Sequence, residues 1–275
     1  MTEKLEIKIN KQSLNISENN SLSIQFSLDG FSFCINDKDT NKTKHFSNYT
    51  FEETLKSPEK LLEKIQAIFE EDKLLQKDFK SIQVIHENYL SSLVPDAYFE
   101  TSILRNYLDV TVKTLKNDFI AFDYIEKIAA KNVYIPYINI NNYLFQSFGE
   151  FEYKHHQTVL IERIIQKKDM NKVMYVNVAK NHFDIIVTEN QELLFVNSFS
   201  FNTKEDFMYY VLFTAEQLEL NTEQFLLKFC GLISEADEIY KITYKYIRNI
   251  GFIHSKNPFA LELKEPQHTN YTLLG

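Results

Sequence analysis

The chain has 275 residues, of which 44% are hydrophobic, 14% aromatic and 25% charged. This balance predicts a globular protein of one or two domains and excludes extensive disorder. Its five glycines stand at least 20 positions apart, which excludes a phosphate loop or dinucleotide fingerprint built on paired glycines. The net charge of −8, with only three arginines among the 30 basic residues, disfavours nucleic-acid binding.

The amino-terminal residues and the cysteines indicate the compartment. Residues 1–10 alternate charged residues with Leu and Ile and lack the apolar core of a signal peptide. The longest uncharged window, Asn132–Gly149, holds a proline and four asparagines, so it is no membrane span. We expect a cytoplasmic protein without direct membrane insertion, in which Cys34 and Cys230 are buried free thiols rather than a disulfide or metal site.

The first predicted elements are three strands and a helix. Apolar alternation over 22–35, on both sides of Asp29-Gly30, predicts a hairpin with its turn at that dipeptide. A third strand covers 44–51. Ser57 and Pro58 are good residues for the start of a helix, and a fourth short strand covers 82–85.

An additional segment follows. It contains Pro95–Leu104, strands near 119–125 and 133–135, and helices near 138–148 and 158–166. The adjacent residues His155 and His156 are predicted to be a solvated helix start, because neighbouring side chains point in different directions and no further ligand stands at metal-binding spacing. The sequence therefore predicts no metal site.

The order of the first elements returns 152 positions later. The repeat comprises a hairpin over 174–187 with its turn at Asn181-His182, a strand over 193–201, a helix capped by Thr203, a fourth strand over 225–230 and a helix over 235–250. Two copies of such length predict two related lobes rather than a solenoid. We place the first lobe, with the additional segment, at 1–168 and the second, shorter lobe at 169–275.

The second hairpin carries a resemblance. The segment Val176–Ile185 resembles the second phosphate loop of the superfamily that includes actin, sugar kinases and the Hsp70 ATPase. This resemblance implies an α/β fold of two duplicated, ribonuclease H-like lobes, each a mixed sheet with flanking helices, around a nucleotide cleft. Phe183, Asp184 and Ile185 keep the end of the superfamily's pattern.

Both phosphate loops depart from that pattern. Ser27 and Asn177 stand where carboxylates linked to magnesium belong, and Ala179, Lys180 and Asn181 replace three glycines. Backbone that approaches phosphates needs residues that tolerate positive φ, and magnesium prefers carboxylate oxygens. We therefore expect a relic cleft without catalytic residues that needs neither ATP nor magnesium. Its candidate residues are Ser27, Asp29, Gly30, Asn177, Lys180, Asn181, Asp184 and Gly231.

A narrower resemblance covers the whole chain. The segments Ser92–Phe99 and His268–Leu274 are similar to an uncharacterised Bacteroidota family, domain of unknown function 3822, grouped with the actin-like ATPases. Similar proteins include actin-like scaffolds of type IV pili and type II secretion, which bind peptides of membrane partners. The resemblance implies a protein partner for this chain.

Three functions follow as alternatives. The first is a non-catalytic actin-like scaffold or adaptor that binds another protein. The second is an active ATPase or kinase of the superfamily, which would depend on Lys180 or Asp184, and the third is a module that senses nucleotide without hydrolysis. Tyr240, Tyr244 and Tyr246 either pack in the core or contribute to a partner surface, since tyrosine is favoured at interfaces.

Overall fold

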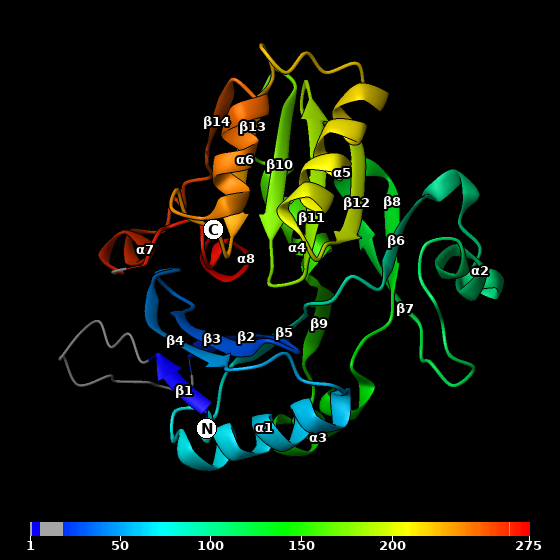
Figure 1. Ribbon diagram of the computed structural model, residues 1–275. Coiled ribbons are helices and arrows are strands. Elements are labelled where there is room, and N and C mark those ends of the chain that lie inside the picture. The colour runs from blue at the N-terminus through cyan, green and yellow to red at the C-terminus, as the bar shows by residue number, and fades with distance from the viewer. Residues whose placement is uncertain (1, 6–18, 264) are drawn as a thin grey trace.

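The computed structural model describes residues 2–5, 19–263 and 265–275. Two large sheets lie one above the other, with shorter helices between them (Figure 1). The lower sheet has the order β1-β4-β3-β2-β5-β9 and comprises β1 (Thr2–Leu5), β2 (Asn20–Ser27), β3 (Gly30–Asp37), β4 (Thr43–Phe51), β5 (Ser81–His86) and β9 (Glu152–His155).

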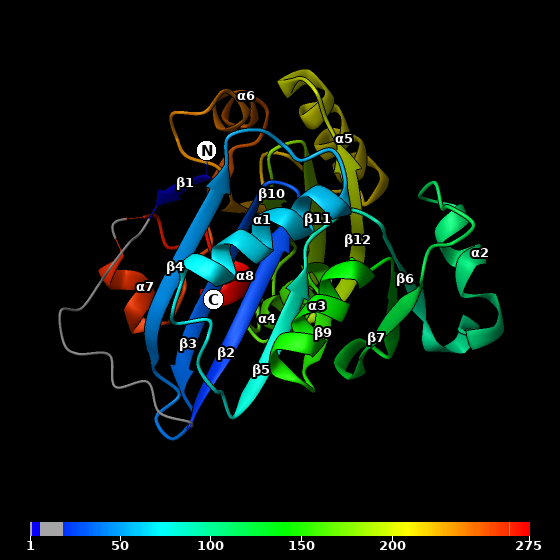
Figure 2. The same cartoon turned by 90° about the horizontal axis from the view of Figure 1, so that it is seen from below.

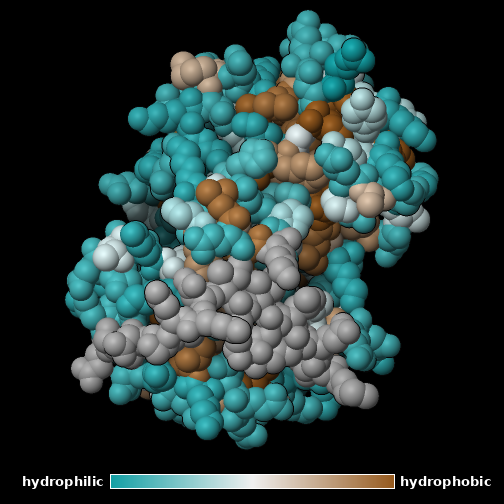
Figure 3. Space-filling view, turned by 90° about the vertical axis from the view of Figure 1, so that its left-hand side faces the viewer, coloured by the Kyte–Doolittle hydropathy of each residue, from teal (hydrophilic) through white to brown (hydrophobic). Residues whose placement is uncertain are grey.

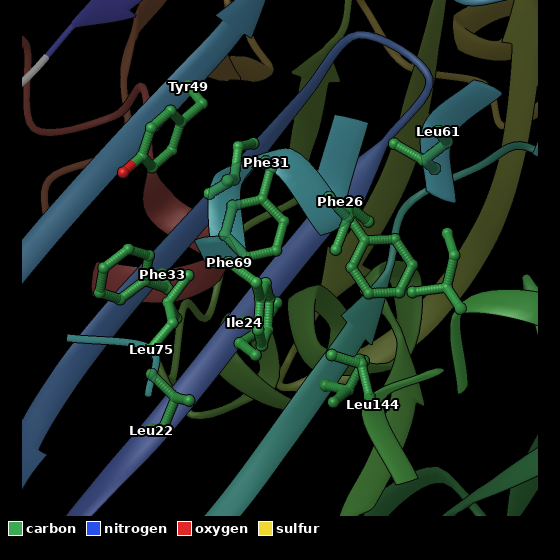
Figure 4. Packing of buried hydrophobic residues seen from close by; sticks show 14 of the residues in the cluster. Leu22, Ile24, Phe26, Phe31, Phe33, Tyr49, Leu61, Phe69, Leu75 and Leu144 are labelled. Carbon is green, nitrogen blue, oxygen red and sulfur yellow. The ribbon is translucent and has the colours of Figure 1, made fainter. Parts of the chain in front are cut away.

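Two helices cover the outer face of this sheet, α1 (Pro58–Glu71) and α3 (Ile138–Phe148), as Figure 2 shows from below. The side chain of Ser57 accepts a hydrogen bond from the Lys60 amide, which confirms the predicted cap of α1. Leu22 and Ile24 of β2 are fully buried with Leu61 of α1 (Figure 4). The alternating apolar residues of the hairpin therefore form the core of the first lobe.

The upper sheet has the order β12-β11-β10-β13-β14. It comprises β10 (Val173–Val178), β11 (His182–Glu189), β12 (Glu192–Ser200), β13 (Leu226–Gly231) and β14 (Asn249–Phe252), and its outer face carries α5 (Lys204–Gln217) and α6 (Glu238–Tyr246). Thr203 and Asp206 form a capping box at the start of α5, as the helix signal predicted.

The two sheets repeat one topology. In both, an antiparallel hairpin is flanked by a third antiparallel strand on one side and by two parallel strands on the other. Phe26 pairs with Phe31 in the first hairpin, and Val178 pairs with Phe183 in the second, so the offset of 152 positions holds at the level of strand register. The predicted α/β fold of duplicated lobes is confirmed.

The turn of the first hairpin differs from the prediction by one residue. It consists of Leu28 and Asp29, because Gly30 already pairs with Ser27 as the first residue of β3. A Cβ atom on Gly30 would lie 2.7 Å from the carbonyl oxygen of Tyr49 on β4. Glycine is needed here for close contact between two strands rather than for the turn.

Three helices lie between the sheets, α4 (His156–Ile165), α7 (Pro258–Glu262) and α8 (Tyr271–Leu274). α4 follows β9 directly, and its residues Leu160 and Ile161 pack onto the second sheet. Leu273 and Leu274 of α8 pack onto the first sheet beside Cys34. Each lobe is thus covered on its inner face by a helix that follows the last strand of the other lobe.

The additional segment forms a third sheet at the side of the molecule (Figure 1). It consists of β6 (Ser91–Pro95), β8 (Ala130–Tyr134) and β7 (Ala121–Ile125), in that order, with α2 (Leu104–Asp109) and three 3-10 turns, η1 (Asp96–Tyr98), η2 (Thr101–Ile103) and η3 (Glu126–Ile128). One face packs against α2 through Val94, Leu108 and Val133, and Ile125 on the other face packs with α4. The prediction missed β6.

Two further expectations concern the last predicted helix and the two cysteines. The helix predicted over 235–250 ends at Tyr246, because 249–252 form β14, which pairs in parallel with β13. Cys34 and Cys230 are buried and free, as predicted, and burial raises the pKa of the Cys34 thiol to about 11. No helix among the described residues has the length and apolar character needed to span a membrane.

Candidate functional site

A cleft of about 330 Å³ lies where the two hairpins meet between the lobes. The turns of both hairpins, the end of β13 and the residues around α8 line it. Six of the eight candidate residues are on its wall, namely Ser27, Asp29, Gly30, Asn177, Lys180 and Gly231. The structure therefore brings together most of the predicted set, while Asn181 and Asp184 lie outside it.

The polar groups at the turn of the first hairpin bond to other residues of the first lobe. The Asp29 amide donates to Ser27 Oγ at 3.1 Å, and Thr54 Oγ1 donates to Asp29 Oδ1 at 2.5 Å. The first is a local bond of the turn, whereas the second ties the turn to Thr54, which follows β4.

Lys180 of the second hairpin reaches across the cleft. Its Nζ donates to the carbonyl oxygen of Glu52 at 3.4 Å and lies 3.9 Å from Asp29 Oδ1. The positive charge of Lys180 thus faces groups of the first lobe. Lys180 connects the two lobes at the point where their hairpins approach each other.

The backbone at the end of β13 is tightly packed, and the amides of Gly231 and Leu232 are both hydrogen-bonded. Gly231 has φ +84°, and a Cβ atom there would lie 2.2 Å from the carbonyl oxygen of Val178. Its amide donates to the carbonyl of His268 at 2.9 Å, and the Leu232 amide donates to that of Val178 at 2.7 Å. These two N–H groups are satisfied within the protein, so neither is free to bind an anion.

Asp184 is fully buried behind the cleft. It accepts hydrogen bonds from His156 Nε2 at 2.8 Å, Asn177 Nδ2 at 3.0 Å and Ser198 Oγ at 2.5 Å. Burial disfavours the ionised carboxyl, but the His156 charge and these bonds outweigh burial and hold the pKa of Asp184 below its usual range. Asp184 lies neither in the cleft nor on an open strand face.

The prediction that His155 and His156 form a solvated helix start is wrong, because both side chains are completely buried. Burial lowers the pKa of His155, which accepts from Asn132 on β8 and donates to the Asn88 carbonyl. Burial also opposes the charge of His156, yet the nearby Asp184 carboxylate raises its pKa above the usual value. The adjacent histidines do point in different directions, and they thereby join β9 to both other sheets.

Comparison with known proteins places the chain in a family. Its sequence matches the family described as "Protein of unknown function (DUF3822)" over residues 9–250. The chain belongs to this family. No curated protein matches the DUF3822 protein.

Solved structures establish the fold of the DUF3822 protein. A Bacteroides thetaiotaomicron protein with actin-like ATPase fold and unknown function has a TM-score of 0.78 and 24% identity, with 86% of this chain and 91% of that chain covered. A structure of the PilM-PilN type IV pilus biogenesis complex has a TM-score of 0.53 and 10% identity, with 85% and 88% covered. The DUF3822 protein has the actin-like ATPase fold.

The charges of the cleft wall disfavour a nucleotide. Asp29, Glu52 and Glu87 line the cleft with Lys180 as the only cation among the lining residues, so a triphosphate would meet an excess of negative charge. No group of three or more His, Cys, Asp or Glu in the described part of the chain could hold a metal ion.

Glu52, Glu87 and Thr272 are among the cleft residues that were not predicted from the sequence. Glu52 follows β4 directly and Glu87 follows β5, and Thr272 lies in α8. A usable signal existed for the two glutamates, because each stands one or two residues beyond a predicted strand of the first lobe. Nothing in the sequence indicated that α8 would return to the cleft.

Proposed function

We propose that this DUF3822 protein is a non-catalytic scaffold of actin-like fold that binds another protein. The contact of Lys180 with Asp29 and the Glu52 carbonyl carries the proposal, since it directs the lysine of the cleft to groups of the first lobe instead of leaving it free for a phosphate. The neutral side chains of Ser27 and Asn177 support it, because they supply no charge for a metal-dependent phosphoryl transfer.

The third sheet and its flanking turns offer a surface for a partner. Val110 is 84% exposed and Tyr98 is 75% exposed. We call the exposed apolar side chains of this segment the insertion patch: Tyr98, Ile103, Val110, Leu115, Phe119, Phe122 and Tyr124. Such concentrations on a surface are typical of interaction sites. Figure 3 shows the opposite side of the molecule. Its described residues are mostly hydrophilic, and the hydrophobic ones lie mainly in the upper half of the view.

The likeness to PilM in its complex with PilN gives further support. In that structure a protein with a related fold forms part of an assembly with another protein. The partner of the DUF3822 protein need not resemble PilN, because one fold serves many functions.

Nucleotide binding tests the non-catalytic part of the proposal. We expect calorimetry with Mg-ATP to show no binding and thermal unfolding to be unchanged by ATP, with or without magnesium. Tight Mg-ATP binding would contradict the proposal. Phosphate release abolished by Lys180→Ala would then favour the ATPase or kinase, whereas stabilisation without phosphate release would favour the sensing module.

Paired surface variants test the scaffold part. We expect Tyr98→Ser combined with Val110→Ser to reduce the recovery of a specific partner from native cell extract by about tenfold, as loss of two exposed anchors does at many interfaces. The matched control is Tyr209→Ser with Phe213→Ser on α5, whose side chains are also exposed. Equal loss in both double variants, or no loss in either, would argue against the insertion patch.

A further inference from the structure

We propose that a cavity between α3 and the first sheet, which we call the α3 cavity, binds a neutral saccharide. It has a volume of about 730 Å³, within the range of roughly 300–1,000 Å³ that ligand pockets occupy. It begins where the parallel strands β2, β5 and β9 start, at Ser21, Ser81 and Glu152, and extends along α3. This goes beyond the scaffold function, which concerns a partner on the third sheet.

The α3 cavity is separate from the cleft between the lobes. The cleft is lined by Ser27 at the end of β2 and by Glu87 just after β5, whereas the α3 cavity is lined by the first residues of the same two strands. The two sites therefore lie at opposite ends of the first sheet.

The charges in the wall of the α3 cavity cancel. Its charged lining residues are two lysines and two glutamates, Lys38, Lys80, Glu150 and Glu152. A wall with equal numbers of positive and negative side chains favours neither an anion nor a cation. We therefore expect a ligand without net charge.

A buried amide in the same wall has a fixed orientation. Asn141 of α3 is 6% exposed and lines the α3 cavity. Burial lowers the pKa of His86 to about 3, so its ring is neutral and carries one N–H. Because the Tyr137 amide donates to His86 Nδ1 at 3.1 Å, the ring proton is on Nε2, which donates to Asn141 Oδ1 at 2.9 Å. The Asn141 oxygen is thus held by His86.

The nitrogen of this amide points independently to a ligand. Asn141 Nδ2 is buried and makes no hydrogen bond with any described residue. Buried polar side chains are nearly always paired, and an unpaired buried donor is costly. Turning the amide over would lose the bond to His86, so the nitrogen stays without an acceptor. An oxygen of a ligand in the α3 cavity would supply one.

The rest of the wall combines aromatic rings with neutral polar groups. Phe145 of α3 is 59% exposed and lines the α3 cavity with Tyr153 of β9. Gln83 and Asn142 add side-chain amides, which both donate and accept hydrogen bonds. A saccharide matches such a wall, because its hydroxyl groups also donate and accept while its C–H faces pack against aromatic rings.

The test uses calorimetry on the complete chain with the neutral disaccharides maltose, cellobiose, lactose and N,N′-diacetylchitobiose. We expect at least one of them to bind and to raise the unfolding temperature in a concentration-dependent way. Its affinity should be the same at low and at high salt, since no net charge attracts it. Absence of binding by all of these disaccharides at millimolar concentration would overturn the proposal.

Variants locate the binding. We expect Phe145→Ala to weaken disaccharide binding about tenfold, through loss of the ring that packs on the sugar. Phe213→Ala on α5 is the matched control, because Phe213 is also an exposed helical phenylalanine, and it should bind as the wild type does. Wild-type affinity in Phe145→Ala would overturn the proposal.

A second variant tests the buried amide. We expect Asn141→Ala to weaken binding about fivefold, by removing one hydrogen-bond donor. This variant also removes the acceptor of the His86 N–H, so Phe145→Ala remains the informative variant if Asn141→Ala unfolds. A folded Asn141→Ala with wild-type affinity would contradict the assigned role of the amide and with it the proposal.

Other ligand classes are distinguished in the same assay. Binding of glucosamine or gluconate without any disaccharide would indicate a charged ligand, and binding of a capped, neutral trialanine peptide instead would indicate a peptide. Either outcome would contradict the saccharide. Loss of disaccharide binding concerns only the present inference, whereas the recovery of a partner through the insertion patch tests the scaffold function separately.

Discussion

The two lobes carry the same row of polar residues in different surroundings. Across the hairpin and third strand of the first lobe the paired residues are Gln25, Ser32 and Asn48, and at the equivalent register of the second lobe they are Asn177, Asp184 and Ser198. The first row is neutral, and all of it lines the cleft. The second contains a carboxylate and is mostly buried behind the wall of the cleft.

The covering helices explain this difference. The second row lies beneath the start of α4, a helix of 10 residues, where His156 supplies the positive charge that Asp184 needs. The first sheet is covered by α8, a helix of four residues. Because α8 is shorter than α4, it leaves the polar residues of the first lobe open to solvent. An acidic residue among them would be solvated by water and would not require a buried charged partner. Polar residues at matching positions thus serve stability in one lobe and a cleft in the other.

The largest expected effect comes from breaking the buried pair. We expect His156→Ala to lower the free energy of unfolding by about 3–5 kcal/mol, because it leaves the Asp184 carboxylate buried without its charged partner. Ser32→Ala, at the position equivalent to Asp184, should cost below about 1.5 kcal/mol. Urea unfolding measures both, and equal losses would mean that the two rows do not differ in the way described.

The end of β13 gives the next effect. We expect Gly231→Ala to lower the free energy of unfolding by about 2–4 kcal/mol, since the residue has positive φ and its Cβ would overlap the Val178 carbonyl. Gly251→Ala is the matched control, because nothing lies within 4 Å of its Cβ position. His86 occupies the position equivalent to Gly231 in the first lobe. Unchanged stability of Gly231→Ala would therefore indicate that this strand end accepts a side chain in both lobes.

The pH dependence of stability sharpens the comparison further. The pKa of Asp184 lies below its ordinary value of 3.8, so its contribution is complete above pH 3.8 and is lost as the pH falls through the lowered pKa. The pKa of His156 lies above its ordinary 6.5, so its contribution is complete below pH 6.5 and is lost as the pH rises through the raised pKa. The stability difference between wild type and Asp184→Asn should therefore be greatest between pH 3.8 and 6.5.

Urea unfolding across pH 3–9 measures that difference. His86 provides an internal contrast, because burial lowers its pKa to about 3. The contribution of neutral His86 to the stability of the protein is therefore lost only as the pH falls. Its effect is shared by wild type and Asp184→Asn and is removed by subtraction. A difference that is independent of pH would show that Asp184 and His156 do not form a charged pair.

The smallest expected effect concerns Lys180. We expect Lys180→Met to change the free energy of unfolding by less than about 0.5 kcal/mol, because the side chain is 43% exposed and its contact with Asp29 is long. Thermal unfolding measures this. A loss of several kcal/mol would mean that the contact between hairpins, and not the buried pair, is the main link between the lobes.

Local patterns predicted most of the fold. The alternation in β2 and β3, the caps of α1 and α5 and the 152-residue offset are all short-range properties, and they recur in the structure. The end of α6 was wrong because β14 depends on pairing with β13, which lies far away in the chain. The repeat contained the missing information, since the first lobe also places a parallel strand at this position. The division of the chain at residue 168 stays a prediction.

The candidate site was less predictable. The position of Asp184 within the apolar strand 182–189 was a signal that the sequence analysis did not use, because a charge in a buried strand requires a partner. The identity of that partner could not be predicted, since His156 comes from a different lobe and its burial depends on three sheets meeting. The same holds for Thr272, which reaches the cleft only because the chain end folds back.

The adjacent histidines have a mechanical consequence. The chain passes from one lobe to the other at β9 and α4, where His156 bonds to Asp184 of the second sheet, and a rotation that moved the start of α4 away from that sheet would have to break this pair. Such a rotation would leave a buried charge without its partner, so the pair opposes this movement of the lobes. We therefore expect the lobes to keep the same relative position when a partner binds at the outer surface.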